Sequence, residues 1–232
     1  MEKYKKYVKP TQFAEFEIIK AIVTKKWAIG QKLAPERELA ETLGITRPTL
    51  REALQRLSRD GWITIRHGKP TIVNDYKNNG GLGILNSLVH FNDLASSKLI
   101  KDWLEFRVIV FPTLAYKAIL LKPHEVTNML NKAPALNATK QEFAVYDWDL
   151  QMVMINNCDN SIARMLYNDL SELYHKHCLK YFDNELTKTT SFKYYKDLKY
   201  AITNSKENIT AIIKNAMQEG STLWSKVQEF NY

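Results

Sequence analysis

The chain has 232 residues, of which 45% are hydrophobic and 25% charged, a composition typical of globular proteins and not of domain-scale disorder. Its formal net charge of +8 favours a polyanionic partner such as nucleic acid. No apolar run reaches the roughly 18 residues of a membrane span, the start lacks the apolar core of a signal peptide, and two cysteines indicate no disulfide framework. We therefore expect a cytoplasmic protein that binds no membrane.

Three short helices are predicted at the start of the chain. Apolar residues at helical spacing predict a first helix over residues 12–27 and a second over residues 36–43, which Gly44 ends. A third helix begins at Thr46, a residue type that caps helix N-termini well, and runs to Gly61.

Two short strands follow these helices. β-branched residues mark both strands within residues 62–73, and the turn between them, residues 66–70, carries positive charge at its tip. Three helices followed by a basic hairpin is the order of a winged helix-turn-helix. We therefore predict that residues 1–76, with 15 Lys and Arg against 9 Asp and Glu, form a winged helix-turn-helix that binds DNA.

The third predicted helix begins with residues suited to reading bases. Arg47 and Arg51 are four residues apart and share a helix face, and arginine can hold guanine by two hydrogen bonds in the major groove. The hairpin adds His67, Gly68 and Lys69, whose glycine allows the backbone to approach the minor groove closely. The alternative is an ordinary helical hairpin with solvated arginines, but the combination of a glycine turn, a donor-rich helix and a basic hairpin favours DNA.

The chain changes character after the hairpin. Seven of the eight glycines precede residue 84, so we expect short elements before that point and long helices after it. We place a linker at residues 77–83 and an all-α helical bundle, a ligand-binding and regulatory domain, at residues 84–232, with one of its helices over residues 160–182. The alternative is that the glycine-rich segment is a loop inside one domain.

The segment 35–57, PERELAETLGITRPTLREALQRL, resembles the GntR family of bacterial regulators. The continuation over residues 59–71 is similar to the branch of that family that regulates fatty-acid metabolism. The resemblance implies a homodimer that binds a palindromic operator in double-stranded DNA. Pro48 departs from that branch, which has threonine there, and proline offers neither a hydroxyl nor an amide donor. The DNA contacts that the resemblance implies are Arg37, Thr46, Arg47, Thr49, Arg51, His67 and Gly68.

Helical domains of this family bind one of two kinds of effector. Many hold a metal and a small carboxylate, whereas the fatty-acid branch binds a long-chain acyl-CoA without metal. Asp147 stands at the position of the metal-binding aspartate, but Gln151 replaces the histidine expected one turn later. His175 and His177 are two residues apart and cannot face the same way on a helix. We therefore expect no metal and no other cofactor, with long-chain acyl-CoA as the effector.

The resemblance also implies the residues of an acyl-CoA pocket. Ser221 lies beside the position of the pocket serine, which Gly220 occupies. Two positions depart: Met217 replaces a glycine, and Lys196 replaces a histidine. The alternative is that the aromatic residues are simply part of the core. The implied ligand-binding residues are Arg107, Tyr181, Tyr195, Ser221 and Trp224.

Catalytic motifs are missing from the sequence pattern. It contains no nucleophile–base signature, no paired acid motif and no phosphate-cradling glycine loop, so we expect that the protein is not an enzyme. We predict a transcription regulator, a repressor or activator of fatty-acid metabolism genes, that long-chain acyl-CoA releases from its operator. The alternatives are a GntR-family regulator with another effector, such as a metal-bound carboxylate, and a pure interaction module.

Overall fold

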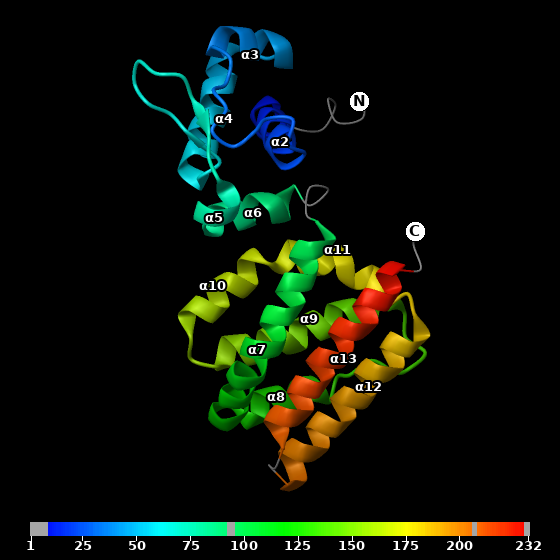
Figure 1. Cartoon of the computed structure of the whole chain (residues 1–232). Helices are drawn as coiled ribbons and strands as arrows, with labels where there is room; N and C mark the ends of the chain where they lie inside the picture. Colours follow the sequence, from blue (N-terminus) through cyan, green and yellow to red (C-terminus); the bar gives the residue numbers. More distant parts are fainter. Residues whose placement is uncertain (1–8, 92–95, 206–207, 230–232) are drawn as a thin grey trace. The chain divides into compact units, whose positions relative to one another are not determined.

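The computed structural model describes residues 9–91, 96–205 and 208–229 and forms two compact units, residues 1–95 and 96–232. Helices dominate both units, and the only sheet among the described residues is a two-stranded antiparallel hairpin in the first unit (Figure 1). The predicted fold class, a winged helix-turn-helix followed by an all-α domain, is confirmed. Within the described part of the chain, no helix is both long and apolar enough to span a membrane.

The first unit begins with three helices. They are α2 (Pro10–Val23), α3 (Glu36–Leu43) and α4 (Arg47–Asp60). Gly44 ends α3 and Gly61 ends α4, both at positive φ (65° and 100°), a conformation in which glycine avoids the Cβ clash of other residues. The apolar faces of the three helices enclose one buried core.

The hairpin of the first unit follows α4. Strand β1 (Ile63–Thr64) pairs antiparallel with β2 (Ile72–Val73), with Ile63 opposite Val73 and Thr64 opposite Ile72. Trp62, Ile63 and Val73 are buried in the core of the unit. The turn between the strands therefore projects from a fixed base.

The glycine-rich segment after the hairpin is folded. It contains α5 (Tyr76–Asn79) and the start of α6 (Leu82–His90), and Ile84 of α6 joins the core of the first unit. A Cβ at Gly83 would lie 2.9 Å from the Cα of Asp60 at the end of α4. Residues 77–83, the predicted linker, thus lie within the first unit, where glycine allows α6 to approach α4.

The second unit is built from seven α-helices and one π-helical turn in its described part. Helices α7 and α13 run side by side, with α9 packed on α7 and α12 packed on α13 (Figure 1). The elements are α7 (Ser97–Leu121), α8 (Pro123–Leu130), α9 (Lys140–Asn157), α10 (Ser161–Asp169), α11 (Ser171–Tyr181), α12 (Glu185–Tyr200), η2 (Ala201–Ser205) and α13 (Ile209–Glu229).

One predicted helix is two helices in the structure. The segment 160–182 breaks between α10 and α11 at Leu170, whose φ and ψ of −90° and 0° are not helical. The hydroxyl of Ser171 donates to the carbonyl oxygen of Asn168 at 2.7 Å. The prediction of a continuous helix was wrong because this break depends on a local turn and a buried Leu170, and it leaves no Gly or Pro signal.

Candidate DNA interface and ligand pocket

The start of α4 is held by a threonine cap. The backbone N–H of Thr49 donates to Oγ1 of Thr46 at 3.4 Å, and the two hydroxyl oxygens lie 2.8 Å apart. Arg47 and Pro48 follow the cap at the exposed first turn. Proline is tolerated there because the first amides of a helix have no partner within the helix. The turn therefore presents hydroxyls and an arginine to solvent.

Arg51, one turn further along α4, is paired with α3. Its Nη2 and Nε donate to Oε2 of Glu36 at 2.8 and 3.2 Å, and 60% of its side-chain surface remains exposed. Sequence reasoning missed Glu36, which is 15 residues away along the chain. The contact brings the start of α3, where exposed Arg37 lies, next to Arg51 of α4.

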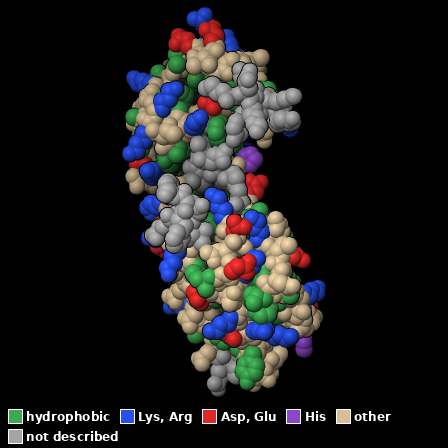
Figure 2. All heavy atoms as spheres, turned by 90° about the vertical axis from the view of Figure 1, so that its right-hand side faces the viewer, with side chains coloured by type: hydrophobic (Ala, Val, Ile, Leu, Met, Phe, Trp, Pro, Cys, Tyr) green, Lys and Arg blue, Asp and Glu red, His purple; other side chains and the backbone are tan. Residues whose placement is uncertain are grey.

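The turn of the hairpin carries the remaining predicted DNA contacts. His67, Gly68 and Lys69 are all exposed, and Gly68 has a φ of 67°. The backbone N–H of Lys69 donates to the carbonyl oxygen of Arg66 at 3.1 Å, which closes the turn. Figure 2 shows Lys and Arg side chains along one margin of the first unit, whereas both signs of charge are interspersed on the second.

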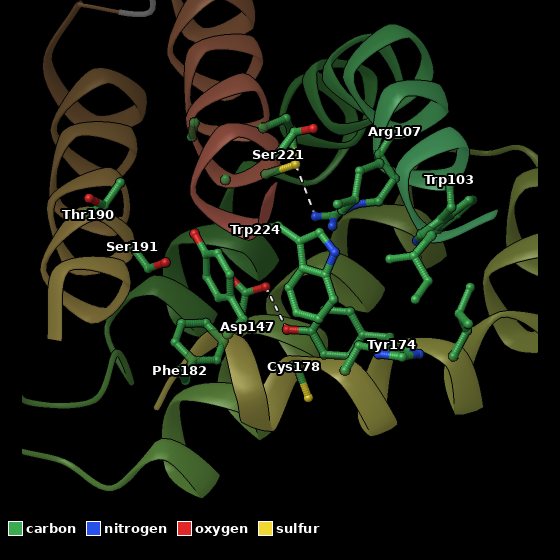
Figure 3. Close-up of a pocket in the computed structure, with 18 of the residues that line it drawn as sticks. Trp103, Arg107, Asp147, Tyr174, Cys178, Phe182, Thr190, Ser191, Ser221 and Trp224 are labelled. Carbon is green, nitrogen blue, oxygen red and sulfur yellow. Dashed lines mark hydrogen bonds between the residues drawn. The ribbon is translucent and has the colours of Figure 1, made fainter. Parts of the chain in front are cut away.

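The second unit contains a partly open pocket of about 90 Å³. Its walls are mostly apolar and aromatic, with a few polar groups that point inward (Figure 3). The lining comes from α7, α9, α11, the residue after α11, α12 and α13: Ile100, Trp103, Leu104, Arg107, Asp147, Leu173, Tyr174, His177, Cys178, Tyr181, Phe182, Thr190, Ser191, Tyr194, Ala216, Met217, Gly220, Ser221 and Trp224.

Asp147 forms the polar floor of this pocket. Its carboxylate accepts hydrogen bonds from Tyr174 Oη (2.8 Å), Tyr195 Oη (2.8 Å) and Gln151 Nε2 (2.7 Å). Burial, reinforced by this carboxylate, raises the pKa of both tyrosines well above the ordinary value. The tyrosines therefore stay protonated and act as donors. The amide of Gln151 also donates to Asp147, at the position where metal-binding relatives are expected to have a histidine.

Arg107 supplies the cation of the pocket. Its Nη2 donates to the thioether sulfur of Met217 at 3.1 Å, and Figure 3 shows the guanidinium directed toward the helix that carries Ser221. The buried Nε of Arg107 has no hydrogen-bond partner among the described residues. Because a buried donor without a partner costs about 1–3 kcal/mol, an acceptor from a ligand would be stabilised here.

Four of the five predicted ligand-binding residues line the pocket. They are Arg107, Tyr181, Ser221 and Trp224. Tyr195 does not line it: this side chain is 1% exposed and lies behind the wall, where it donates to Asp147. Lys196, the next residue, is exposed and stacks over Phe192, with 4.4 Å between Nζ and the ring centre.

Histidines and cysteines near the pocket do not assemble a metal site. Within the described ranges, no three His, Cys, Asp or Glu side chains are placed to hold an ion. His175 packs edge-on to Trp148, and His177 packs edge-on to Trp224. Burial raises the pKa of Cys178 to about 12, so this pocket thiol stays protonated and is a poor nucleophile.

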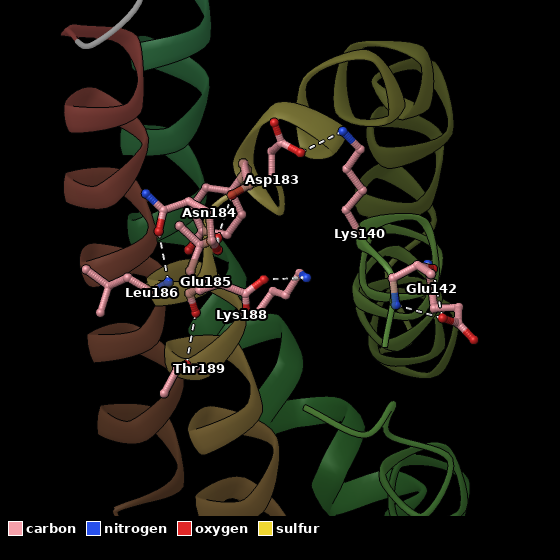
Figure 4. A network of polar contacts seen from close by, with 11 residues as sticks. Lys140, Glu142, Asp183, Asn184, Glu185, Leu186, Lys188 and Thr189 are labelled. Carbon is pink, nitrogen blue, oxygen red and sulfur yellow. Dashed lines mark hydrogen bonds and ion pairs between the residues drawn. The ribbon is translucent and has the colours of Figure 1, made fainter. Parts of the chain in front are cut away.

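A polar network anchors α12, which forms one pocket wall. Lys140, at the start of α9, pairs with Asp183 at 2.6 Å, just before the N-cap of α12 (Figure 4). Asn184 caps α12 by accepting from the backbone N–H of Leu186 at 2.8 Å. Sequence reasoning missed the pair, because its two residues are 43 positions apart.

Comparison with known protein families gives two matches that follow each other along the chain. Residues 10–73 match the family described as bacterial regulatory proteins of the gntR family, and residues 74–230 match the FadR C-terminal domain. Together the two matches cover the described residues of both units almost completely.

Curated relatives match the chain over most of its length. A fatty acid metabolism regulator protein from Shewanella pealeana is 33% identical over 221 residues, which are 95% of this chain and 92% of the relative. Proteins of the same name from Pasteurella multocida and Yersinia pestis are each 32% identical, over 95% and 94% of this chain and 92% of each relative.

One solved structure has a similar fold. It is that of Lar, described as controlling the expression of the Listeria monocytogenes agr system, with a TM-score of 0.60 and 12% sequence identity. The likeness covers 95% of this chain and 99% of that one. At this identity it shows a shared architecture alone.

Proposed function

The chain belongs to the GntR family of bacterial regulatory proteins and carries a FadR C-terminal domain, and from this we propose that it controls fatty-acid metabolism genes in response to acyl-CoA. It is a transcription regulator that binds DNA and not an enzyme. In the proposal, a homodimer binds a palindromic operator. Binding of long-chain acyl-CoA in the pocket of the second unit releases the dimer from the operator.

The pocket carries the proposal for the effector. An acyl-CoA thioester needs apolar walls for its chain and a hydrogen-bond donor for its polar end. The cavity of the second unit combines mostly apolar and aromatic walls with Arg107, whose buried Nε has no partner among the described residues. The curated relatives share the name fatty acid metabolism regulator protein, which supports the proposed role in controlling fatty-acid metabolism.

The exposed groups of the first unit support the proposal for DNA. Arg47 lies at the first turn of α4, and Arg51 lies one turn later on the same side, the end of a recognition helix that meets base edges. Arg37, Thr46 and Thr49 lie near these two arginines. We assign them, together with Arg47 and Arg51, to the DNA contact. The turn with His67, Gly68 and Lys69 is assigned to the minor groove or to phosphates.

Ligand and DNA would oppose each other through a coupling free energy between the two sites. The test uses the full-length protein and an operator selected from a random DNA pool, with binding followed by fluorescence anisotropy. We expect oleoyl-CoA to weaken operator binding at least tenfold, while free CoA, which lacks the acyl chain, leaves it unchanged. Unchanged operator affinity at saturating oleoyl-CoA would refute the proposed release.

Two further measurements complete the test. Light scattering should give the mass of two chains for the free protein and of two chains plus one duplex for its operator complex, as the isologous symmetry of a palindromic site requires. Metal analysis of the purified protein separates acyl-CoA from a metal-bound carboxylate. A stoichiometric metal, retained after gel filtration, would favour the carboxylate instead.

A further inference from the structure

Met217 lies where a ligand of the pocket would be expected to bind. It shares one face of α13 with Gly220, Ser221 and Trp224, three, four and seven residues further on, and all four line the cavity. Its sulfur accepts from Arg107 at 3.1 Å. A thioether is a weak acceptor, so an oxygen acceptor could replace it on the guanidinium at little cost.

The free volume beside Met217 is small. The pocket measures about 90 Å³, whereas an engineered apolar cavity of about 150 Å³ holds one benzene molecule. The pocket as it stands therefore has room for fewer than about six carbon atoms by that comparison. A longer acyl chain must move a side chain of the wall, and Met217 has the flexible, unbranched side chain that adapts most readily.

We propose that Met217 is the specificity-determining residue of this pocket: it occupies the place of the ligand on Arg107 and limits the length of the acyl chain that enters. The inference rests on the proposed function, because it assumes that acyl thioesters are the ligands. Its consequence is that any bound thioester displaces the Met217 sulfur from Arg107, whereas only a long chain must also move the Met217 side chain out of the cavity.

The test compares two thioesters on the full-length protein by calorimetry. For each variant, the dissociation constant of butyryl-CoA is divided by that of oleoyl-CoA, so that effects on the shared CoA group cancel. We expect Met217→Ala to raise this ratio at least tenfold over the unsubstituted protein, because the truncated side chain no longer competes with the long chain. A ratio within threefold of the original would overturn the inference.

Two more variants separate the effect of the volume of the Met217 side chain from the effect of its contact with Arg107. Met217→Leu keeps most of the volume but removes the acceptor, so its ratio should stay within threefold; a larger rise would contradict the assignment to volume. Met217→Phe fills more space and should lower the ratio at least tenfold. This variant decides the question if Met217→Ala fails to fold, and an unchanged ratio in it would overturn the inference.

Controls distinguish this inference from the proposed function. Met152→Ala truncates a partly buried methionine of the same core that does not line the pocket, and its ratio should not change. If oleoyl-CoA releases the operator but every ratio stays constant, only the role of Met217 is refuted. If neither thioester binds the protein or any variant, the proposed effector and this inference fail together.

Discussion

Arg51, one turn after the start of α4, is paired with Glu36 of α3. The carboxylate orients the guanidinium through two donors and offsets part of its charge, while most of the side chain stays exposed. Exposed ion pairs add little to folding stability. The pair is therefore better understood as a constraint on how Arg51 meets a base.

Removing this constraint should lower the specificity of DNA binding and leave the folding stability nearly unchanged. In Glu36→Gln, we expect tighter binding to random DNA, because one negative charge near the phosphates is lost, and a ratio of specific to random affinity that falls severalfold. Fluorescence anisotropy on operator and random duplexes measures both affinities. Glu41→Gln removes the same charge five residues further along α3, and an equal fall in its ratio would assign the effect to net charge alone.

Alanine substitutions of Arg47 and Lys69 should affect binding to operator and to random DNA in different ways. Arg47→Ala should cost about 1–3 kcal/mol at the operator and relax base preference, as expected for a base contact. Lys69→Ala should weaken specific and random binding about equally, as expected for a phosphate contact. Parallel losses on both DNAs for Arg47→Ala would remove it from the base-reading residues.

Residue spacing predicted where these residues lie on α4 better than it predicted their partners. Arg47 and Arg51 follow from helical periodicity and Thr46 from cap chemistry, both of which are local. Glu36 and the Asp147 network depend on contacts between residues distant in sequence. Tyr195 shows the same limit: its position on α12 was predicted, but its side chain lies behind the pocket wall because it pairs with Asp147.

Among the elements, α6 has a small residue at its closest approach to α4. Glycine at position 83 lets α6 approach the end of α4, where a Cβ would lie 2.9 Å from a backbone atom of Asp60. Composition predicts flexibility from such glycine-rich sequence, but it cannot distinguish a linker from a close contact between helices. The break at Leu170 escaped prediction for a related reason, since it follows from packing.

Gly83→Ala should therefore destabilise the protein, whereas replacing a glycine by alanine within a helix usually stabilises it. Alanine normally stabilises a helix interior by about 1 kcal/mol relative to glycine, but overpacking against Asp60 should destabilise this unit by about 1–3 kcal/mol. Urea unfolding measures the difference. The control is Gly81→Ala at the N-cap of α6, since a Cβ there meets nothing within 4 Å; equal midpoints for the two variants would contradict the packing role.

For the whole molecule, the distribution of charge agrees with the proposal that the first unit binds DNA and the second binds the ligand. Residues 1–76 carry a net charge of +6, from 15 Lys and Arg against 9 Asp and Glu, and the remainder carries +2, from 18 against 16. Contacts with phosphates release counterions, so operator affinity should fall steeply with salt. The smaller net charge of the rest of the chain agrees with the assignment of the DNA contact to the first unit.

Linkage between the two sites gives the sharpest test of the whole chain. If oleoyl-CoA weakens operator binding by some factor, the operator must weaken oleoyl-CoA binding by the same factor, because both describe one thermodynamic cycle. We expect calorimetric titrations of oleoyl-CoA into the free protein and into its operator complex to differ by the factor measured with DNA, at equal salt and protein concentration. Unequal factors would mean that a further equilibrium, such as association of the protomers, responds to the ligand. A ligand that binds equally well with and without operator would exclude direct coupling, because no equilibrium shifts without a difference in affinity between its two states.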